Sequence, residues 1–235
     1  MSFVLFVVQG LAACTPTPTP TPIPIRIEAT DLAAPLVFDL AGRYLNSDVT
    51  LLPSVVSLST VKADLAAQKS DVALAVTRAP NFFATPMGYV TLTVVVNSLN
   101  PVAQLSAAQV QAIFAGQITV WGQVGATGVP SATLQGSSRV INAVSREPGS
   151  DAESAFESSL LLGASPNNNT LIAPTWDAMR EVIGQDAQAI GFLPEGELRA
   201  GMKPVGVSAR VLVVALSMSE PGGALRDFLA WAQGR

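Results

Sequence analysis

The sequence predicts an α/β fold in which helices cover a largely parallel sheet. Two observations lead to this prediction. The chain has 235 residues, of which 49% are apolar and 13% charged, so it is long and apolar enough to bury a sizeable core. Segments rich in Val, Ile and Leu alternate along it with segments whose apolar residues recur at helical spacing.

The individual elements follow from local patterns. Ile25, Arg26 and Ile27 alternate as a short strand, and the leucines between residues 31 and 45 recur at helical spacing. Further strands are predicted over 49–52, 72–76, 90–96, 139–144, 189–193 and 211–216. Further helices are predicted over 59–68, 106–114, 151–162, 176–183 and 223–232.

Composition excludes several classes of function. The net charge of −4 and the isoelectric point of about 4.8 provide no basic surface for nucleic acid. The chain has no His, and its single Cys is Cys14. These counts exclude a Ser-His-Asp triad, His-ligated metals, a thiolate cluster and an intrachain disulfide. We therefore expect no metal, no cofactor and no enzymatic activity.

The N-terminal region has the order of an export and anchoring signal. An apolar stretch ends at Leu11-Ala12-Ala13-Cys14, and alternating Thr and Pro follow it. The first part resembles a bacterial lipoprotein signal, which implies that residues 1–13 are removed and that Cys14 is lipidated. Alternating prolines favour a stiff, extended spacer over 14–24. The alternative is an apolar N-terminal helix or strand with an incidental Cys.

Three segments of the chain resemble one family. In residues 105–121, Ser106 is a candidate N-cap, Gly116 a helix stop, and Phe114 and Trp121 apolar anchors. Residues 146–156 place an Arg before a turn that opens a helix, and residues 189–192 read Ala-Ile-Gly-Phe. In this order the segments resemble phosphate-binding proteins of ABC transporters, in the type II periplasmic binding protein superfamily. The resemblance extends from residue 25 to residue 235.

The resemblance implies an α/β fold of two lobes with a ligand cleft between them. Lobe 1 would comprise residues 25–88 plus 205–235, and lobe 2 residues 89–204. The crossovers would lie near 89–97 and 193–211. In such a cleft, helix N-termini and free amides can hold an anion without net positive charge, so the acidic isoelectric point does not exclude an oxyanion.

The resemblance also implies a set of ligand-binding residues. Arg146 would supply a guanidinium suited to a tetrahedral oxyanion, and Ser150 a hydroxyl and an amide at a helix start. Thr77 and Arg78 end a predicted strand and would point into the cleft; the alternative for Arg78 is a surface ion pair.

Two further candidates have strong structural alternatives. Thr30 matches a hydroxyl of the family's first ligand loop, but it could equally be the N-cap of the next helix. Ser57 matches the Ser of a Gly-Ser-Gly turn, but its neighbours are Val56 and Leu58. It could instead be a turn or strand-edge hydroxyl.

Residues 151–153 depart from the family pattern. Asp151-Ala152-Glu153 stands where the family has Gly-Thr-Arg, which removes one hydroxyl donor and puts an acid in place of a cation. Carboxylates here could satisfy the helix's own amides and fill the anion site from within. Alternatively, Asp151 could accept a proton from a monohydrogen phosphate.

Three hypotheses for the function follow. The first is a monomeric, lipid-anchored, extracytoplasmic receptor that captures a small oxyanion, phosphate in first place, for an ABC transporter permease. The second is the same fold with an altered or degraded pocket, which binds another solute or serves as a surface sensor or interaction module. The third is an enzyme using a carboxylate pair such as Asp151 and Glu153, but side chains two apart on a helix diverge.

Overall fold

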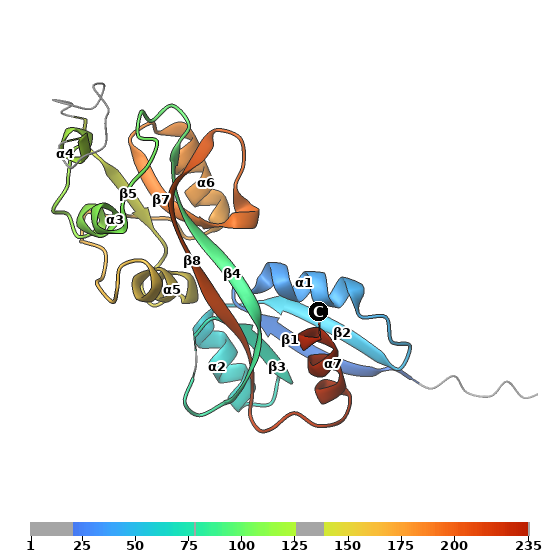
Figure 1. Ribbon diagram of the computed structural model, residues 1–235. Coiled ribbons are helices and arrows are strands. Elements are labelled where there is room, and N and C mark those ends of the chain that lie inside the picture. Colours follow the sequence, from blue (N-terminus) through green and yellow to red (C-terminus); the bar gives the residue numbers. More distant parts are fainter. Residues whose placement is uncertain (1–20, 78, 126–138, 235) are drawn as a thin grey trace, which may run out of the picture.

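The protein is built as two lobes that share two long strands (Figure 1). The computed structural model describes residues 21–77, 79–125 and 139–234. Strands β4 (Phe83–Asn97) and β8 (Met202–Ser217) run diagonally from one lobe to the other. They pair with each other from Phe83↔Ser217 to Asn97↔Met202. The mixed α/β class and the two-lobed arrangement predicted from the sequence are confirmed.

A single sheet of eight strands in the order β2-β1-β3-β8-β4-β7-β5-β6 passes through both lobes. Its outer pairs are parallel, but the central pairs β3·β8, β8·β4 and β4·β7 are antiparallel. The expectation of a largely parallel sheet is therefore wrong for the centre. The long strands β4 and β8 run in opposite directions, and both contribute to the sheet of each lobe.

Lobe 1 consists of the elements at the two ends of the chain together with the adjoining parts of β4 and β8. Helices α1 and α7 pack on one face of its sheet and α2 on the other, and each face buries its own apolar cluster. The elements are β1 (Ile23–Ala29), α1 (Ala34–Arg43), β2 (Val49–Val55), α2 (Leu58–Ala66), β3 (Val72–Ala75) and α7 (Gly223–Gln233).

Lobe 2 consists of the middle of the chain and buries one large apolar cluster. Its elements are α3 (Ala107–Phe114), α4 (Trp121–Gly125), β5 (Asn142–Ser145), α5 (Asp151–Ser159), β6 (Leu171–Ile172), α6 (Trp176–Gln185), β7 (Ala189–Pro194) and the 3₁₀ turn η1 (Glu195–Glu197). The short elements α4, β6 and η1 were not predicted, because so few residues carry no periodic pattern.

The start of the folded part differs from the prediction. The strand β1 begins at Ile23, so Ile23 and Pro24 belong to the sheet and not to the predicted spacer. Pro24 pairs with Thr50 of β2, whereas β3 joins β1 only from Ile27 onward. A proline is tolerated there because no second neighbour requires its missing amide.

Helix α1 is also shorter than the predicted 31–45. It begins at Ala34, and Pro35 lies in its first turn, where a missing amide costs nothing. Residues 31–33 form a turn instead. This turn leaves Thr30 and Asp31 free of the helix and lets both side chains reach across to lobe 2.

Helix α3 confirms the local reading of its sequence. Ser106 and Gln109 form a reciprocal capping box at its start, and Gly116 has φ +74° just beyond its end. Phe114 and Trp121 are fully buried in the lobe 2 core. The two aromatic residues are therefore structural anchors, as expected.

Gly191 in β7 lets helix α6 approach the sheet closely. A Cβ atom on Gly191 would lie 2.8 Å from Cδ1 of Ile183 and 3.3 Å from Sδ of Met179. Both neighbours are buried residues of α6. The glycine of the Ala-Ile-Gly-Phe segment is thus needed for packing, which positions α6 and the cleft residues at its start.

Candidate functional site

A pocket of about 410 Å³ lies between the two lobes. Lobe 1 lines it with the loop after β1 and the loop between β2 and α2, and lobe 2 with the loop between β5 and α5. Such loops at the carboxyl ends of strands are where open α/β sheets bind ligands, and the volume falls within the usual range for ligand pockets. Its lining residues are Thr30, Asp31, Val55, Val56, Ser57, Leu58, Ser59, Arg146, Glu147, Pro148, Gly149, Ser150, Asp151 and Pro174.

The Asp151 carboxylate joins the lobes at this pocket. Its Oδ2 accepts hydrogen bonds from Thr30 Oγ1 at 2.6 Å and from the Val76 amide at 2.8 Å. Its Oδ1 accepts a hydrogen bond from Thr77 Oγ1 at 2.5 Å. The three donors belong to lobe 1, whereas Asp151 is the first residue of α5 in lobe 2. Asp151 is 2% exposed, and its bond from Thr30 is buried, whereas the bonds from Val76 and Thr77 are partly buried.

Arg146 makes the second polar connection between the lobes. Its guanidinium forms an ion pair with Asp31 and donates to the Ala173 carbonyl at 2.8 Å. It also lies 4.5 Å above the ring of Trp176, in cation–π contact. The predicted ligand-binding arginine thus lines the pocket, but its charge is already balanced by Asp31.

Ser150 caps helix α5. Its hydroxyl accepts from the Glu153 amide at 3.1 Å, and Glu153 Oε2 accepts in return from the Gly149 amide at 2.9 Å. Burial and the negative charge of Glu157 raise the pKa of the Glu153 carboxyl, and the hydrogen bond from the Gly149 amide offsets only part of this rise. Glu153 therefore satisfies the start of α5 as the sequence suggested, whereas Asp151 turns away to lobe 1.

The two candidates with structural alternatives resolve differently. Thr30 is not an N-cap, because α1 starts at Ala34 with Ala33 before it and no side-chain cap. Ser57 does cap a helix: its hydroxyl accepts from the Thr60 amide at the start of α2, which differs from the turn or strand-edge role predicted as its alternative. Both residues line the interlobe pocket. Arg78 lies outside the described residues.

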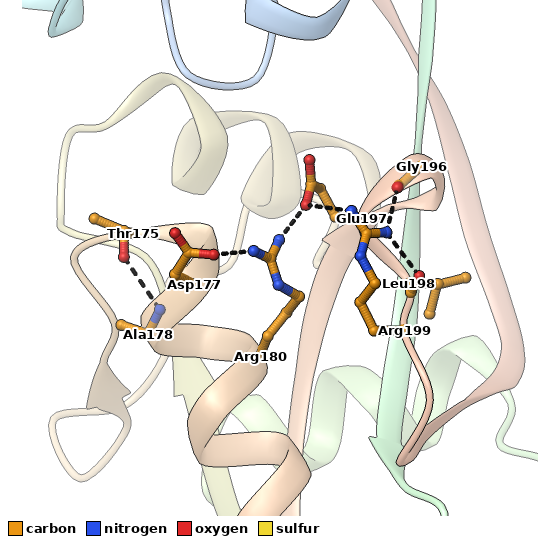
Figure 2. Close-up of polar contacts among 8 residues, drawn as sticks. All are labelled: Thr175, Asp177, Ala178, Arg180, Gly196, Glu197, Leu198 and Arg199. Atoms are coloured by element: carbon orange, nitrogen blue, oxygen red, sulfur yellow. Dashed lines mark hydrogen bonds and ion pairs between the residues drawn. The ribbon is translucent and has the colours of Figure 1, made fainter.

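A second compartment of about 310 Å³ adjoins the pocket. The two share Asp31, Arg146 and Pro174, and the second adds side chains from α6 and η1. Figure 2 shows Arg180 of α6 between the carboxylates of Asp177 and Glu197, both of which it pairs with. These ion pairs fix the wall of the second compartment. Its lining contains three acidic side chains, Asp31, Asp177 and Glu197, and two arginines, Arg146 and Arg180.

A larger hollow, of about 470 Å³, lies at the opposite end of lobe 1. It is lined by β1, the end of α2 and the loop before α7, and its ion pair joins Arg26 with the Asp71 carboxylate. That pair lowers the pKa of Asp71. The hollow receives side chains from one lobe alone, so we place the functional site between the lobes.

Neither a membrane-spanning helix nor a cluster of metal ligands is found among the described residues. No helix there combines the length and apolar character needed to cross a membrane. No three His, Cys, Asp or Glu side chains among the same residues are grouped as metal ligands.

The sequence predicted side chains from both lobes at the pocket but missed some of the groups that they contact. Thr30, Ser57, Thr77, Arg146 and Ser150 all lie at or against the pocket. It missed Asp31, the Val76 amide and Trp176. A backbone amide carries no residue signal, and the turn that frees Asp31 was taken for helix.

Fold and site together define a two-lobed binding protein with a ligand-sized pocket between its lobes. Residues 31–205 match the model of the PBP superfamily domain, and the chain belongs to this superfamily. No curated protein matches it.

Solved structures with the same fold have low sequence identity to this chain. An ABC-type phosphate transport receptor from Vibrio cholerae is 21% identical, with a TM-score of 0.67 over 90% of this chain and 93% of its own. A protein described as a phosphate ABC transporter substrate-binding protein with bound phosphate, from Clostridium perfringens, is 17% identical, with a TM-score of 0.73 over 88% and 92%. The OxyR2 regulatory domain from Vibrio vulnificus is 14% identical, with a TM-score of 0.62 over 90% and 93%. These likenesses establish the fold.

Proposed function

We propose that this protein is an extracytoplasmic solute-binding receptor that captures a small oxyanion, phosphate in first place, and delivers it to an ABC transporter. One observation supports an oxyanion as the ligand. Thr30 Oγ1, the Val76 amide and Thr77 Oγ1 converge from lobe 1 on the two oxygens of a single carboxylate. Such a set of donors is built to bind an anion without a positive charge of its own.

The other parts of the proposal rest on the sequence and on the two-lobed fold. Cys14 after Leu11-Ala12-Ala13 supports a lipid anchor on the cell membrane, with residues 1–13 removed. The long strands β4 and β8 support lobes that divide near residues 89–97 and 193–211 and move as a hinge. We propose a monomer that performs no chemistry on its ligand and that presents its closed form to the permease.

Equilibrium titration of the purified protein with phosphate, sulfate and molybdate tests the oxyanion. We expect phosphate to bind, and Arg146→Ala to weaken binding at least about tenfold, which is ~1.4 kcal/mol. Arg226→Ala removes an equally charged but exposed side chain of α7, which lines no part of the interlobe pocket, and should leave binding unchanged. Failure of all three anions to bind would reject the proposal.

A second candidate function is favoured because the hydrogen-bond donors and the arginine of the pocket already have partners within the protein. Asp151 accepts all three bonds from lobe 1, and Asp31 balances Arg146. A pocket whose donors are satisfied from within is compatible with a receptor for another solute, or with a surface sensor or interaction module. If no oxyanion binds, this candidate takes the place of the first.

A further inference from the structure

Asp151 takes the position that an oxyanion ligand would need. Its two carboxylate oxygens receive three hydrogen bonds from two different segments of lobe 1, the loop after β1 and the end of β3. The bond between Thr30 and Asp151 joins residues 121 positions apart and is buried. Hydrogen bonds to an ionised acceptor are roughly twice as strong as neutral ones, and burial strengthens them further.

The charges around the pocket disfavour binding of a further anion while the Asp151 carboxylate is present. The described residues that line the two compartments carry five carboxylates and two guanidinium groups. The carboxylates are Asp31, Glu147, Asp151, Asp177 and Glu197, and the cations are Arg146 and Arg180. A dianion placed near Asp151 would meet like charge at short range, and its binding would be weakened by that repulsion.

We propose that Asp151 is an internal competitor for the anion donors of the interlobe pocket. Its carboxylate occupies the oxyanion donors of lobe 1, holds the two lobes together, and has to leave before a free oxyanion binds. This inference rests on the proposed function for the identity of the competing ligand. That Asp151 links the lobes does not depend on the proposed function, because it follows from the hydrogen bonds of Asp151 with lobe 1.

The proposal has a quantitative consequence. An oxyanion binds only to the fraction of molecules in which Asp151 has left its donors, so the observed dissociation constant exceeds the intrinsic one by the inverse of that fraction. Removing the carboxylate sets the fraction to one. The affinity should then rise, even though the variant has lost three hydrogen bonds.

The first experiment compares the wild type with Asp151→Ala. In titrations with inorganic phosphate, Asp151→Ala should bind at least about tenfold more tightly than the wild type. In small-angle X-ray scattering without phosphate, the variant should have the larger radius of gyration, and phosphate should reduce it. Asp227→Ala, which removes an exposed carboxylate of α7, is the matched control and should behave as the wild type in both assays.

A second variant separates opening of the lobes from binding. Thr77→Val weakens the hold of lobe 1 on Asp151, but it also removes a donor that phosphate would use and keeps the Asp151 charge beside the site. It should therefore open the lobes in scattering without binding phosphate more tightly than the wild type. It also provides a test if Asp151→Ala fails to fold, because a conservative change at a half-buried threonine leaves the core intact.

The outcomes distinguish the inference from the proposed function. Equal phosphate affinity and equal radii for the wild type and Asp151→Ala would overturn the inference while the oxyanion receptor stands. Opening of the lobes in both variants without phosphate binding by any of them would support Asp151 as a contact that holds the lobes together and reject the oxyanion receptor.

Discussion

Glu28 is a buried carboxyl group on β1 that does not line the interlobe pocket. It is 8% exposed, and burial together with the negative charge of Asp64 raises its pKa, although Lys69 acts in the opposite direction. A carboxyl group whose pKa is higher in the folded state binds its proton more tightly there. Its contribution to stability is therefore complete below the unfolded pKa and is lost as the pH rises through the folded value.

We expect Glu28→Gln to remove this loss. At pH 7 the variant should have a larger free energy of unfolding than the wild type, and the difference should disappear near pH 3, where the wild-type carboxyl is protonated in both states. Urea denaturation at several pH values measures both quantities. Glu220→Gln, at an exposed position, serves as the control, and a difference that does not depend on pH would contradict the expectation.

Helix α3 is an element whose start, end and buried aromatic residue were predicted from the sequence. Its capping box needs Ser106 and Gln109 at fixed spacing, and its end needs a glycine with positive φ. Phe114, its last residue, packs edge-on against Phe156 with ring centroids 4.8 Å apart, and Phe156 stacks on Phe192 of β7 at 3.9 Å. The helix is thus tied to the sheet through one aromatic series.

Phe114→Ala should therefore destabilise lobe 2 without touching the pocket. The expected cost is about 3–5 kcal/mol of unfolding free energy, because a large cavity remains in a fully buried cluster. Ser106→Ala removes only the cap and should cost about 1 kcal/mol. Urea unfolding measures both, and weaker phosphate binding with an unchanged unfolding curve would instead assign Phe114 to the site.

At the scale of the whole molecule, the proposed lipid anchor depends on Cys14, which lies outside the described residues. If Cys14 carries lipid, Cys14→Ser should move the protein from the membrane fraction to the soluble fraction, as followed by fractionation and immunoblotting. Thr15→Ala, one residue further on, should leave the protein with the membrane. A Cys14→Ser protein that stays on the membrane with residues 1–13 removed would disprove the lipid anchor.

The crossing strands are the feature for which local reading worked least well. The sequence predicted strands over 90–96 and 211–216, whereas β4 and β8 extend from Phe83 to Asn97 and from Met202 to Ser217. Their additional residues are less uniformly apolar, and parts of them are exposed. These residues are strands because they pair with each other across the long β4·β8 ladder, and pairing between distant segments leaves no local pattern.

The sequence by itself determined the α/β class, most helices and strands, the buried anchors Phe114 and Trp121, and the group of polar residues near the pocket. The class, the helices and the strands depend on spacing within one element, on caps and on composition, whereas the anchors and the polar residues followed from the resemblance of whole segments to a family. The tertiary structure decided that Asp151 of lobe 2 receives the donors of Thr30 and Thr77 in lobe 1, and that Arg146 is paired with Asp31. The residues of each pair lie 74 to 121 positions apart, so their bonds depend on how the two lobes meet along β4 and β8.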